Sequence, residues 1–462
     1  MIKTMNKDAG TGRWSWKYAV IKFLAKISFH IYYPRLHVTG TENIPSGGRI
    51  IFAANHRNAL MDALAILLTN HYQPVFLARA DIFSNPLTAG ILRFLKIIPV
   101  YRLTDGVDSM GYNESTFENT VSVLNEGGCI GIMPEGNQEE MKRLRKLKKG
   151  IFRIAFRAAG DAGKEPEVKI IPVGLDYTDI SEFFGGIVVN YGKPLHVSSY
   201  AALFKQHHQK GYNAMKDDLA RELSRLMIDI KDRKNYEKDE LLVKSGSRFL
   251  IEQNPGEKRS YHRKFLTERA VCQALYEYYD NHPDKAEELR IKSERLLELM
   301  TSYGISPEYT VSYSKARIFL FSLVKVVAFP FFLAGFMVHL LPVAIIHLVL
   351  RKLKDRQFIS SFKYILGTLL VPLNYIIAGF FAFSHMHVHN AVIFILLMPL
   401  SGVLSCRISR FAAKLKKNGI FNSICLKDRE FASKFSAMKS DLINEMGPVL
   451  KTARSRLDPA AS

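Results

Sequence analysis

The stretch NHRNALMD, residues 55–62, holds a histidine and a carboxylate whose spacing suits proton transfer. The apolar run just before it is predicted to be a strand, so His56 follows the carboxyl end of that strand, where α/β sheets place ligand sites. Asn58 is predicted to cap the next helix, which puts Asp62 in its first turn. The Asp62 carboxylate can then reach back to orient the imidazole and stabilise its protonated form. The alternative is an ordinary helix start, in which Asp62 only interacts with the helix dipole.

Three further stretches carry residues of chemical interest. KIIPVYR, residues 96–102, ends in Arg102, whose guanidinium suits bidentate binding of phosphate. GIMPEGNQ, residues 131–138, places Glu135 and Gly136 in a turn where the carboxylate could hold a hydroxyl and backbone N–H groups could face an anion. The third is IIPVGLDY, residues 170–177. Each stretch also has an ordinary interpretation when it is taken alone: a surface arginine for the first, a loop for the second and a core strand for the third.

These stretches belong to an alternation of short apolar runs and helical patterns. Strands are predicted at residues 49–55, 74–80, 127–133, 169–177 and 186–192, with helices between them at 59–71, 115–127 and 146–160. Strands separated by helices predict an α/β fold with a mainly parallel sheet flanked by helices. Residues 206–312 then show helical periodicity, with stripes such as Leu219 and Leu223 or Leu289 and Leu296 that indicate ordinary core.

In order and spacing, the four stretches together resemble the glycerol-phosphate and lysophosphatidate acyltransferase family, often called PlsC-type, over roughly residues 40–200. The resemblance implies that His56 is the general base and Asp62 its orienting partner. It also implies that Asn58, Arg102, Glu135 and Gly136 help to bind the substrate. It requires neither a serine or cysteine nucleophile nor a metal or other cofactor, the acyl donor being acyl-CoA or acyl-ACP.

The chain departs from the family pattern at two places. Five residues separate His56 from Asp62, where most of the family has four, and this spacing resembles a subgroup that acylates glycerol 3-phosphate and dihydroxyacetone phosphate. Asn137 and Gln138 stand where the family has a basic residue after Pro-Glu-Gly. Phosphate binding through that position is therefore in doubt, and we expect a nearby arginine to compensate; the candidates are Arg57, Arg143 and Arg145.

Composition points to an anionic partner. The chain of 462 residues has a formal net charge of +21, which suggests nucleic acid, an acidic membrane surface or phosphorylated substrates. Its four cysteines are widely scattered and are interpreted as free thiols in a reducing compartment.

Two long uncharged runs indicate that the anionic partner is a phospholipid membrane and not nucleic acid. Residues 326–350 and 364–406 contain no Asp, Glu, Lys or Arg, and a single membrane span needs about 20 apolar residues. If residues 318–350 form one span and 364–406 a hairpin, the basic clusters at 351–356 and 407–417 lie on the far side from residues 1–312. If both blocks are hairpins or re-entrant segments, all the basic clusters stay on the cytoplasmic side. We favour the second arrangement, with a kink near Pro330, Gly335 or Pro342. HMHVH, residues 385–389, is interpreted as a turn at the membrane interface rather than a metal site.

The N-terminal segment 14–33 is apolar and aromatic but is interrupted by lysines. It is predicted to be an interfacial helix, with Trp14, Trp16, Tyr32 and Tyr33 as membrane anchors; the alternative is a packing helix of the soluble domain. The predicted organisation is an interfacial helix at 1–37, an acyltransferase domain at 38–205, a helical region at 206–312, membrane helices at 313–406 and a basic amphipathic tail at 407–462.

The sequence thus predicts an integral membrane O-acyltransferase of phosphatidic acid and phospholipid synthesis, with its catalytic domain on the cytoplasmic face. The predicted acceptor is glycerol 3-phosphate, dihydroxyacetone phosphate or 1-acyl-glycerol 3-phosphate. Two alternatives are an acyltransferase for another lysophospholipid or membrane alcohol, and a non-catalytic lipid-binding protein.

Overall fold

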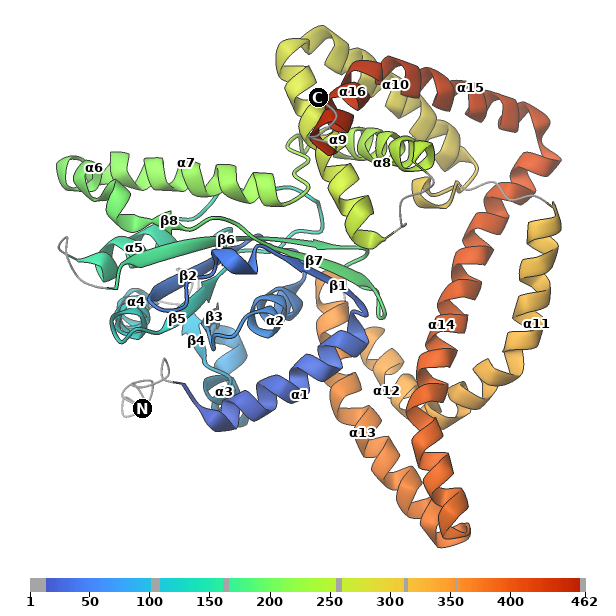
Figure 1. The fold of residues 1–462 in the computed structure, drawn as a ribbon, viewed down its shortest axis with the longest axis horizontal. Coiled ribbons are helices and arrows are strands. Elements are labelled where there is room, and N and C mark those ends of the chain that lie inside the picture. Colours follow the sequence, from blue (N-terminus) through green and yellow to red (C-terminus); the bar gives the residue numbers. More distant parts are fainter. Residues whose placement is uncertain are drawn as a thin grey trace. The chain divides into compact units, whose positions relative to one another are not determined.

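The computed structural model describes residues 14–100, 109–160, 166–254, 260–310, 315–353 and 355–457. The chain divides into two compact units (Figure 1). We call Met1–Asp229 with Arg356–Ser361 the sheet unit, and Ile230–Asp355 with Phe362–Ser462 the helical unit.

The sheet unit is built on one mixed sheet with the strand order β1-β7-β6-β2-β5-β3-β4, and β8 pairs with β6. Its strands are β1 Arg35–Thr39, β2 Arg49–Ala54, β3 Val75–Arg79, β4 Ile97–Val100, β5 Cys129–Ile132, β6 Val168–Tyr177, β7 Gly186–Tyr191 and β8 Leu195–His196. All pairings are parallel except those of β6 with β7 and β8. The predicted fold class is therefore confirmed. Strand β1 was missed, because its sequence RLHVT is short and alternates apolar with polar residues.

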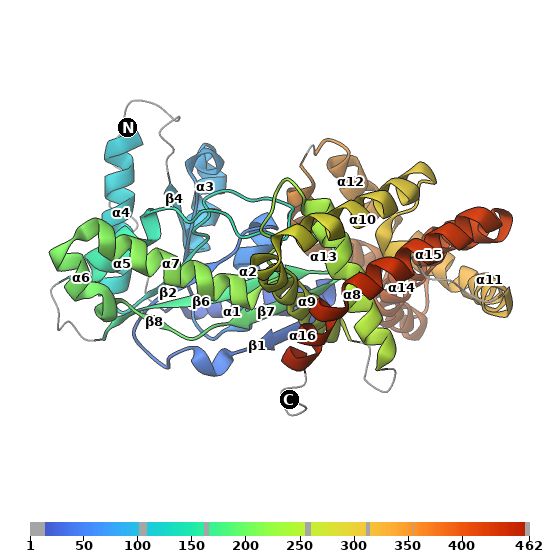
Figure 2. The same cartoon turned by 90° about the horizontal axis from the view of Figure 1, so that it is seen from above.

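Helices cover both faces of this sheet, as Figures 1 and 2 show for α7 on one side and α1 and α2 on the other. The helices are α1 Trp16–Tyr32, α2 Ala59–Thr69, α3 Pro86–Phe94, α4 Ser109–Asn125, α5 Gly150–Ala159, α6 Ala201–Gln206 and α7 His208–Leu226. Successive strand residues point to opposite faces. Ile51 therefore joins a core with α4, α5 and α7, whereas the ring of Phe52 meets Tyr191 on the face covered by α2.

Helix α1 corrects part of the interfacial-helix prediction. Trp14 and Trp16 are 70% and 63% exposed, as membrane anchors require, but Tyr32 and Tyr33 are buried. Helix α1 ends at these tyrosines, where the chain turns into β1, so their rings fill the space between α1 and the sheet. The Tyr33 ring centroid lies 5.9 Å from that of Tyr177 in β6. One face of α1 thus packs on the sheet, while the other exposes aliphatic and phenylalanine side chains; the exposed ones are Val20, Ile21, Phe23, Leu24, Ile27 and Ile31.

The helical unit contains a soluble-type bundle and a group of apolar helices. The bundle helices are α8 Tyr236–Gln253, α9 Tyr261–Asn281, α10 Pro283–Ser302, α15 Arg429–Glu445 and α16 Gly447–Leu457. The apolar helices are α11 Lys315–Val338, α12 Leu340–Leu350, α13 Ile359–His385 and α14 Val388–Lys427. Leu289, Ser293, Leu296 and Met300 are all buried, which confirms that their stripe is core. By length and composition, three described helices, α11, α13 with the short turn before it, and α14, could cross a membrane.

Candidate active site

His56 and Asp62 are in direct contact. The His56 Nδ1 atom lies 2.8 Å from Asp62 Oδ2, so the spacing of five intervening residues does not separate them. His56 follows β2, and Asp62 lies in the first turn of α2. The His56 side chain is 20% exposed and that of Asp62 is fully buried. The imidazole is therefore accessible from outside on one side and held by the carboxylate on the other.

Every oxygen of the Asp62 carboxylate has partners within the sheet unit. Oδ2 also accepts hydrogen bonds from the backbone N–H groups of Arg57 and Asn58, each at 2.8 Å. Oδ1 accepts one from the Tyr177 hydroxyl at 2.6 Å. Burial, and secondly the nearby Asp62 charge, raise the pKa of Tyr177 well above its ordinary value, so the phenol stays a donor at physiological pH. This set of donors fixes the position of the carboxylate.

The start of α2 shows how the chain accommodates five residues between His56 and Asp62. Ala59, the first residue of the helix, has a φ of 42°, in the left-handed region that L-residues other than glycine, asparagine and aspartate rarely adopt. Asn58 occupies the predicted N-cap position, but its side chain makes no capping hydrogen bond. The Asp62 carboxylate instead accepts the backbone N–H groups of Arg57 and Asn58, the two residues that precede the helix. The Asn58 side chain is fully buried and donates to the Tyr33 hydroxyl at 3.3 Å. That Asn58 binds the substrate stays a prediction.

The Pro-Glu-Gly turn lies against the histidine. Glu135 Oε1 accepts the His56 backbone N–H at 3.2 Å, and Oε2 accepts Arg145 Nε at 2.6 Å. Burial raises the pKa of Glu135 above its ordinary value, and the adjacent Arg145 opposes that shift. Gly136 has a φ of 75°, and a Cβ atom there would lie 3.2 Å from the Lys148 side chain, so the turn requires glycine. That Glu135 and Gly136 bind the acceptor stays a prediction.

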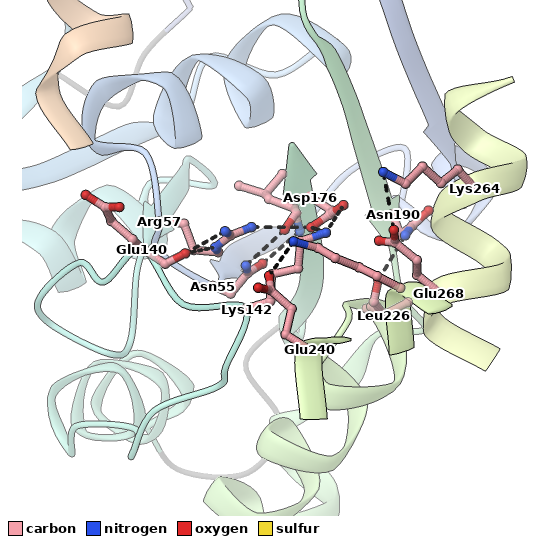
Figure 3. A network of polar contacts seen from close by, with 12 residues as sticks. Asn55, Arg57, Glu140, Lys142, Asp176, Asn190, Leu226, Glu240, Lys264 and Glu268 are labelled. Carbon is pink, nitrogen blue, oxygen red and sulfur yellow. Dashed lines mark hydrogen bonds and ion pairs between the residues drawn. The ribbon is translucent and has the colours of Figure 1, made fainter. Parts of the chain in front are cut away.

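A second polar network lies beside the site, at the carboxyl ends of β2 and β6 (Figure 3). The Arg57 guanidinium donates to the Glu140 backbone carbonyl through Nη2 at 2.6 Å and pairs with Asp176 at 3.3 Å. Lys142 pairs with the same Asp176 carboxylate at 3.1 Å. Arg57 thus holds the loop after Gly136 against β6. Because its guanidinium already has these partners, we disfavour Arg57 as the arginine that replaces the family's basic residue at Gln138.

Arg143 and Arg145, the other two candidates for phosphate binding, each have a guanidinium N–H that is not used in a hydrogen bond among the described residues. The Nη2 atom of Arg143 pairs with Glu139 at 2.9 Å, and Arg145 pairs with Glu135. Arg143 Nε and Arg145 Nη2 are nonetheless buried without a hydrogen-bond partner among the described residues. Arg102 lies outside the described residues. In the part of the chain that the structure describes, no group of three or more His, Cys, Asp or Glu side chains is placed to hold a metal ion.

Tyr177 is the site residue that the sequence analysis missed, because IIPVGLDY was interpreted only as a core strand. Its position carries a usable signal. Strand β6 is parallel to β2 and adjacent to it, and the carboxyl ends of neighbouring parallel strands meet at one edge of a sheet. The end of β6 was therefore one of several strand ends that could lie near His56, and the strand order that brings it there comes from the structure.

Part of the sheet unit matches a known protein family. Residues 35–176 match the family described as Acyltransferase. This segment contains β1 to β5, all of β6 but its last residue, and the His56–Asp62 pair. The resemblance to the acyltransferase family drawn from the four sequence stretches is confirmed for this segment.

Curated relatives carry related names. The chain is 28% identical over 180 residues to a protein of Borreliella burgdorferi named 1-acyl-sn-glycerol-3-phosphate acyltransferase, a match that covers 39% of this chain and 66% of the relative. It is 32% identical over 96 residues to Glycerol-3-phosphate O-acyltransferase 2 of Saccharomyces cerevisiae, covering 20% of this chain and 12% of that protein. A solved structure of the 1-acyl-sn-glycerophosphate (LPA) acyltransferase PlsC from Thermotoga maritima aligns with 45% of this chain and 79% of its own, at 19% identity and a TM-score of 0.33.

Proposed function

We propose that this protein transfers a fatty acyl group from an acyl thioester to a hydroxyl of a glycerol phosphate at a membrane. The single observation that carries the proposal is the 2.8 Å contact between His56 Nδ1 and Asp62 Oδ2. A carboxylate on Nδ1–H leaves the lone pair of the imidazole on Nε2, the nitrogen that can accept a proton.

In the proposed reaction, His56 Nε2 removes the proton of the acceptor hydroxyl as that oxygen attacks the thioester carbonyl carbon. The carbon–oxygen bond forms, and the carbon–sulfur bond then breaks. The imidazolium returns the proton to the departing thiolate. Asp62 stabilises the imidazolium between these steps, because its charge is buried and cannot move away.

A phosphorylated acceptor is supported by the two reserved arginine donors. A buried guanidinium N–H without a partner costs free energy, and a phosphate oxygen would satisfy it with a charge-assisted hydrogen bond. Arg143 Nε and Arg145 Nη2 lie on the loop that Glu135 connects to His56. We propose that Arg145, with Arg143, takes the place of the basic residue that Gln138 replaces. The candidate acceptors are glycerol 3-phosphate, dihydroxyacetone phosphate and 1-acyl-glycerol 3-phosphate.

The membrane location is supported by the apolar helices α11, α13 and α14 and by the exposed apolar face of α1, which we propose lies at the lipid interface. Lys and Arg around these segments favour the cytoplasmic side for the acyltransferase domain. Acyl-CoA and acyl-ACP are both candidate donors, since each presents the same thioester.

The test is thiol release by the purified full-length protein. Long-chain acyl-CoA or acyl-ACP is supplied with each of the three phosphorylated acceptors, with glycerol and with a neutral lysolipid. We expect release with a phosphorylated acceptor, and a loss of at least about 10²-fold in His56→Ala. His71→Ala is the matched control, since His71 is exposed and its ring contacts Tyr72.

The outcomes separate the alternatives. Turnover with the neutral lysolipid alone would favour a different membrane alcohol. No turnover with any acceptor would favour a lipid-binding protein. For the phosphate subsite, Arg145→Gln should raise the KM for a phosphorylated acceptor by about tenfold or more, whereas Arg157→Gln, at a side chain 64% exposed on α5, should leave it unchanged.

A further inference from the structure

Helices α13 and α14 form an antiparallel hairpin. Helix α13 ends at His385 and α14 begins at Val388, so the HMHVH segment contains the turn. Farther along the pair, a Cβ atom at Gly379 would lie 3.3 Å from the Ile395 side chain. Residues equally distant from the turn therefore face each other, as an antiparallel pair requires.

Helix α11 also packs antiparallel to α14. Gly335 lies against the Ser401 backbone, and the Ser405 hydroxyl donates to the Phe332 carbonyl at 3.1 Å. Nearer the start of α11, the rings of Phe321 and Phe411 meet at 5.6 Å. Since α11 and α13 both run opposite to α14, they run in the same direction as each other.

The junction between α11 and α12 lies beside the middle of α13, not beside its end. The His339 Nε2 atom lies 2.8 Å from the Tyr375 hydroxyl oxygen, and Asn374 Nδ2 donates to the Val338 carbonyl at 3.0 Å. At about 1.5 Å of rise per residue, α13 continues about 16 Å beyond this level before it reaches the HMHVH turn. Figure 1 shows the lower end of α11 stopping short of the α13–α14 turn.

Helix α12 must run back from this junction. Its 11 residues span about 16 Å, and Ile359, where α13 starts, lies about 22 Å from the Asn374 level on the side where α11 begins. If α12 continued forward, the chain from Leu350 to Ile359 would have to cover about 38 Å. Nine fully extended residues reach about 32 Å at most, so α12 does not continue forward, and in Figure 1 it turns back toward the side where α11 begins.

Basic residues mark one depth on the surrounding helices. Counted along each helix from the level of the junction, Lys325 on α11, Lys363 on α13 and Arg410 on α14 lie about 12–20 Å away, all in the direction of the α11 start. A returning α12 brings Arg351 and Lys352 to the same range. We call these five residues the basic belt. The hydrocarbon core of a bilayer is about 30 Å thick, so a belt at one surface puts His339 near the midplane and the HMHVH turn near the opposite surface.

We infer that α11 and α12 form a re-entrant hairpin in one leaflet of a phospholipid bilayer, and that only α13 and α14 cross it. The basic belt lies at the phosphates of anionic head groups on the side that attracts Lys and Arg. Backbone that leaves helical geometry at this depth must be covered by protein. His339 meets that condition, because it is only 9% exposed and bonds to Tyr375 and the Gly335 carbonyl.

The consequence is a topology in which the chain before α11 and the chain after α14 leave the bilayer on the same side. Only the HMHVH turn reaches the other side. The length and composition of α11 would by themselves allow a full crossing; its contacts with α13 and α14 argue against one. The inference does not depend on the proposed reaction.

The experiment uses full-length protein in sealed vesicles of phosphatidylcholine with an anionic phospholipid. Single cysteines are introduced in a background in which Cys129, Cys272, Cys406 and Cys425 are replaced by alanine. The positions are Ser302→Cys in α10, Lys352→Cys after α12, Leu340→Cys at the junction and Met386→Cys at the turn. Each variant is treated with a membrane-impermeant maleimide, before and after the vesicles are dissolved in detergent.

We expect Ser302→Cys and Lys352→Cys to be labelled to the same fraction in intact vesicles. The fraction labelled for Met386→Cys should be one minus that value, because its cysteine lies on the opposite side of the bilayer. Both expectations hold for any mixture of protein orientations in the vesicles. Leu340→Cys should react only in detergent. Equal fractions for Ser302→Cys and Met386→Cys, with the complement for Lys352→Cys, would overturn the inference, because α11 would then cross the bilayer. Labelling of Leu340→Cys in intact vesicles would overturn it as well, since the junction would then lie in water.

Discussion

Asp62 Oδ2 lies 2.8 Å from His56 Nδ1 and equally close to two backbone nitrogens, while Oδ1 of the same side chain receives the Tyr177 hydroxyl. One buried carboxylate thus orients the imidazole and also holds the backbone of the two residues that precede helix α2. The same contacts that support catalysis hold the strand–helix turn together, so variants must be chosen to separate the two roles.

Asp62→Asn is expected to reduce acyl transfer by about 10²-fold or more while the protein stays folded. The amide oxygen can replace Oδ2 toward His56 and the two N–H groups, and the amide nitrogen can donate to the Tyr177 oxygen. Only the negative charge that stabilises the imidazolium is then removed. The check is thiol release together with the thermal midpoint of the detergent-solubilised protein. Wild-type turnover in this variant would contradict the role assigned to Asp62.

The His56–Asp62 contact could be predicted from the sequence because it is local. Both residues lie in one strand–helix turn, whose geometry follows from the apolar run and the helix that comes after it. The partners of that turn could not be predicted in the same way. Glu135 and Tyr177 reach it because β2 lies between β5 and β6, and strand order is set by the packing of the whole sheet.

The burial of the tyrosines at the end of α1 could not be predicted from the sequence either. Aromatic residues that follow an apolar helix look the same in sequence whether they face lipid or a protein core, so Tyr32 and Tyr33 were wrongly predicted as membrane anchors. The structure buries them because the chain reverses there to enter β1. The core stripe on α10 was predicted correctly, since its period of 3.6 residues depends on the helix alone.

Ala59→Gly is expected to stabilise the protein by up to about 1 kcal/mol, because glycine adopts a positive φ without the Cβ penalty. The free energy of unfolding is read from thermal or denaturant melts of the detergent-solubilised protein. Ala63→Gly is the matched control in the same helix. There φ is helical, so the substitution should destabilise by about 1 kcal/mol. Destabilisation of the same size at both positions would show that Ala59 is not held in the left-handed region.

Gly136→Ala is expected to destabilise the sheet unit by about 1 kcal/mol or more, because alanine is strained at a φ of 75° and its Cβ would crowd Lys148. Activity should fall further than stability explains, since the turn positions Glu135 against the His56 backbone. Gly150→Ala serves as the control: it stands at the start of α5 with open space around a Cβ, and alanine favours a helix. Equal activities of the two variants would argue that the Pro-Glu-Gly turn has no role in placing His56.

The alkaline limit of stability should depend on Tyr191. Burial raises the pKa of this tyrosine to about 12, whereas in the unfolded chain it ionises near its ordinary value of about 10. The protonated Tyr191 hydroxyl therefore contributes fully to stability below about pH 10. This contribution is lost as the pH rises toward 12, and the total loss is about 2–3 kcal/mol.

Tyr191→Phe should lower the melting temperature at pH 8, because the contact of 2.6 Å between the Tyr191 hydroxyl and Thr69 is lost. The melting temperature of this variant should then fall less steeply than that of wild type between pH 10 and 12. Parallel curves for the two proteins over that range would mean that the Tyr191 hydroxyl is not protected from ionisation by the fold.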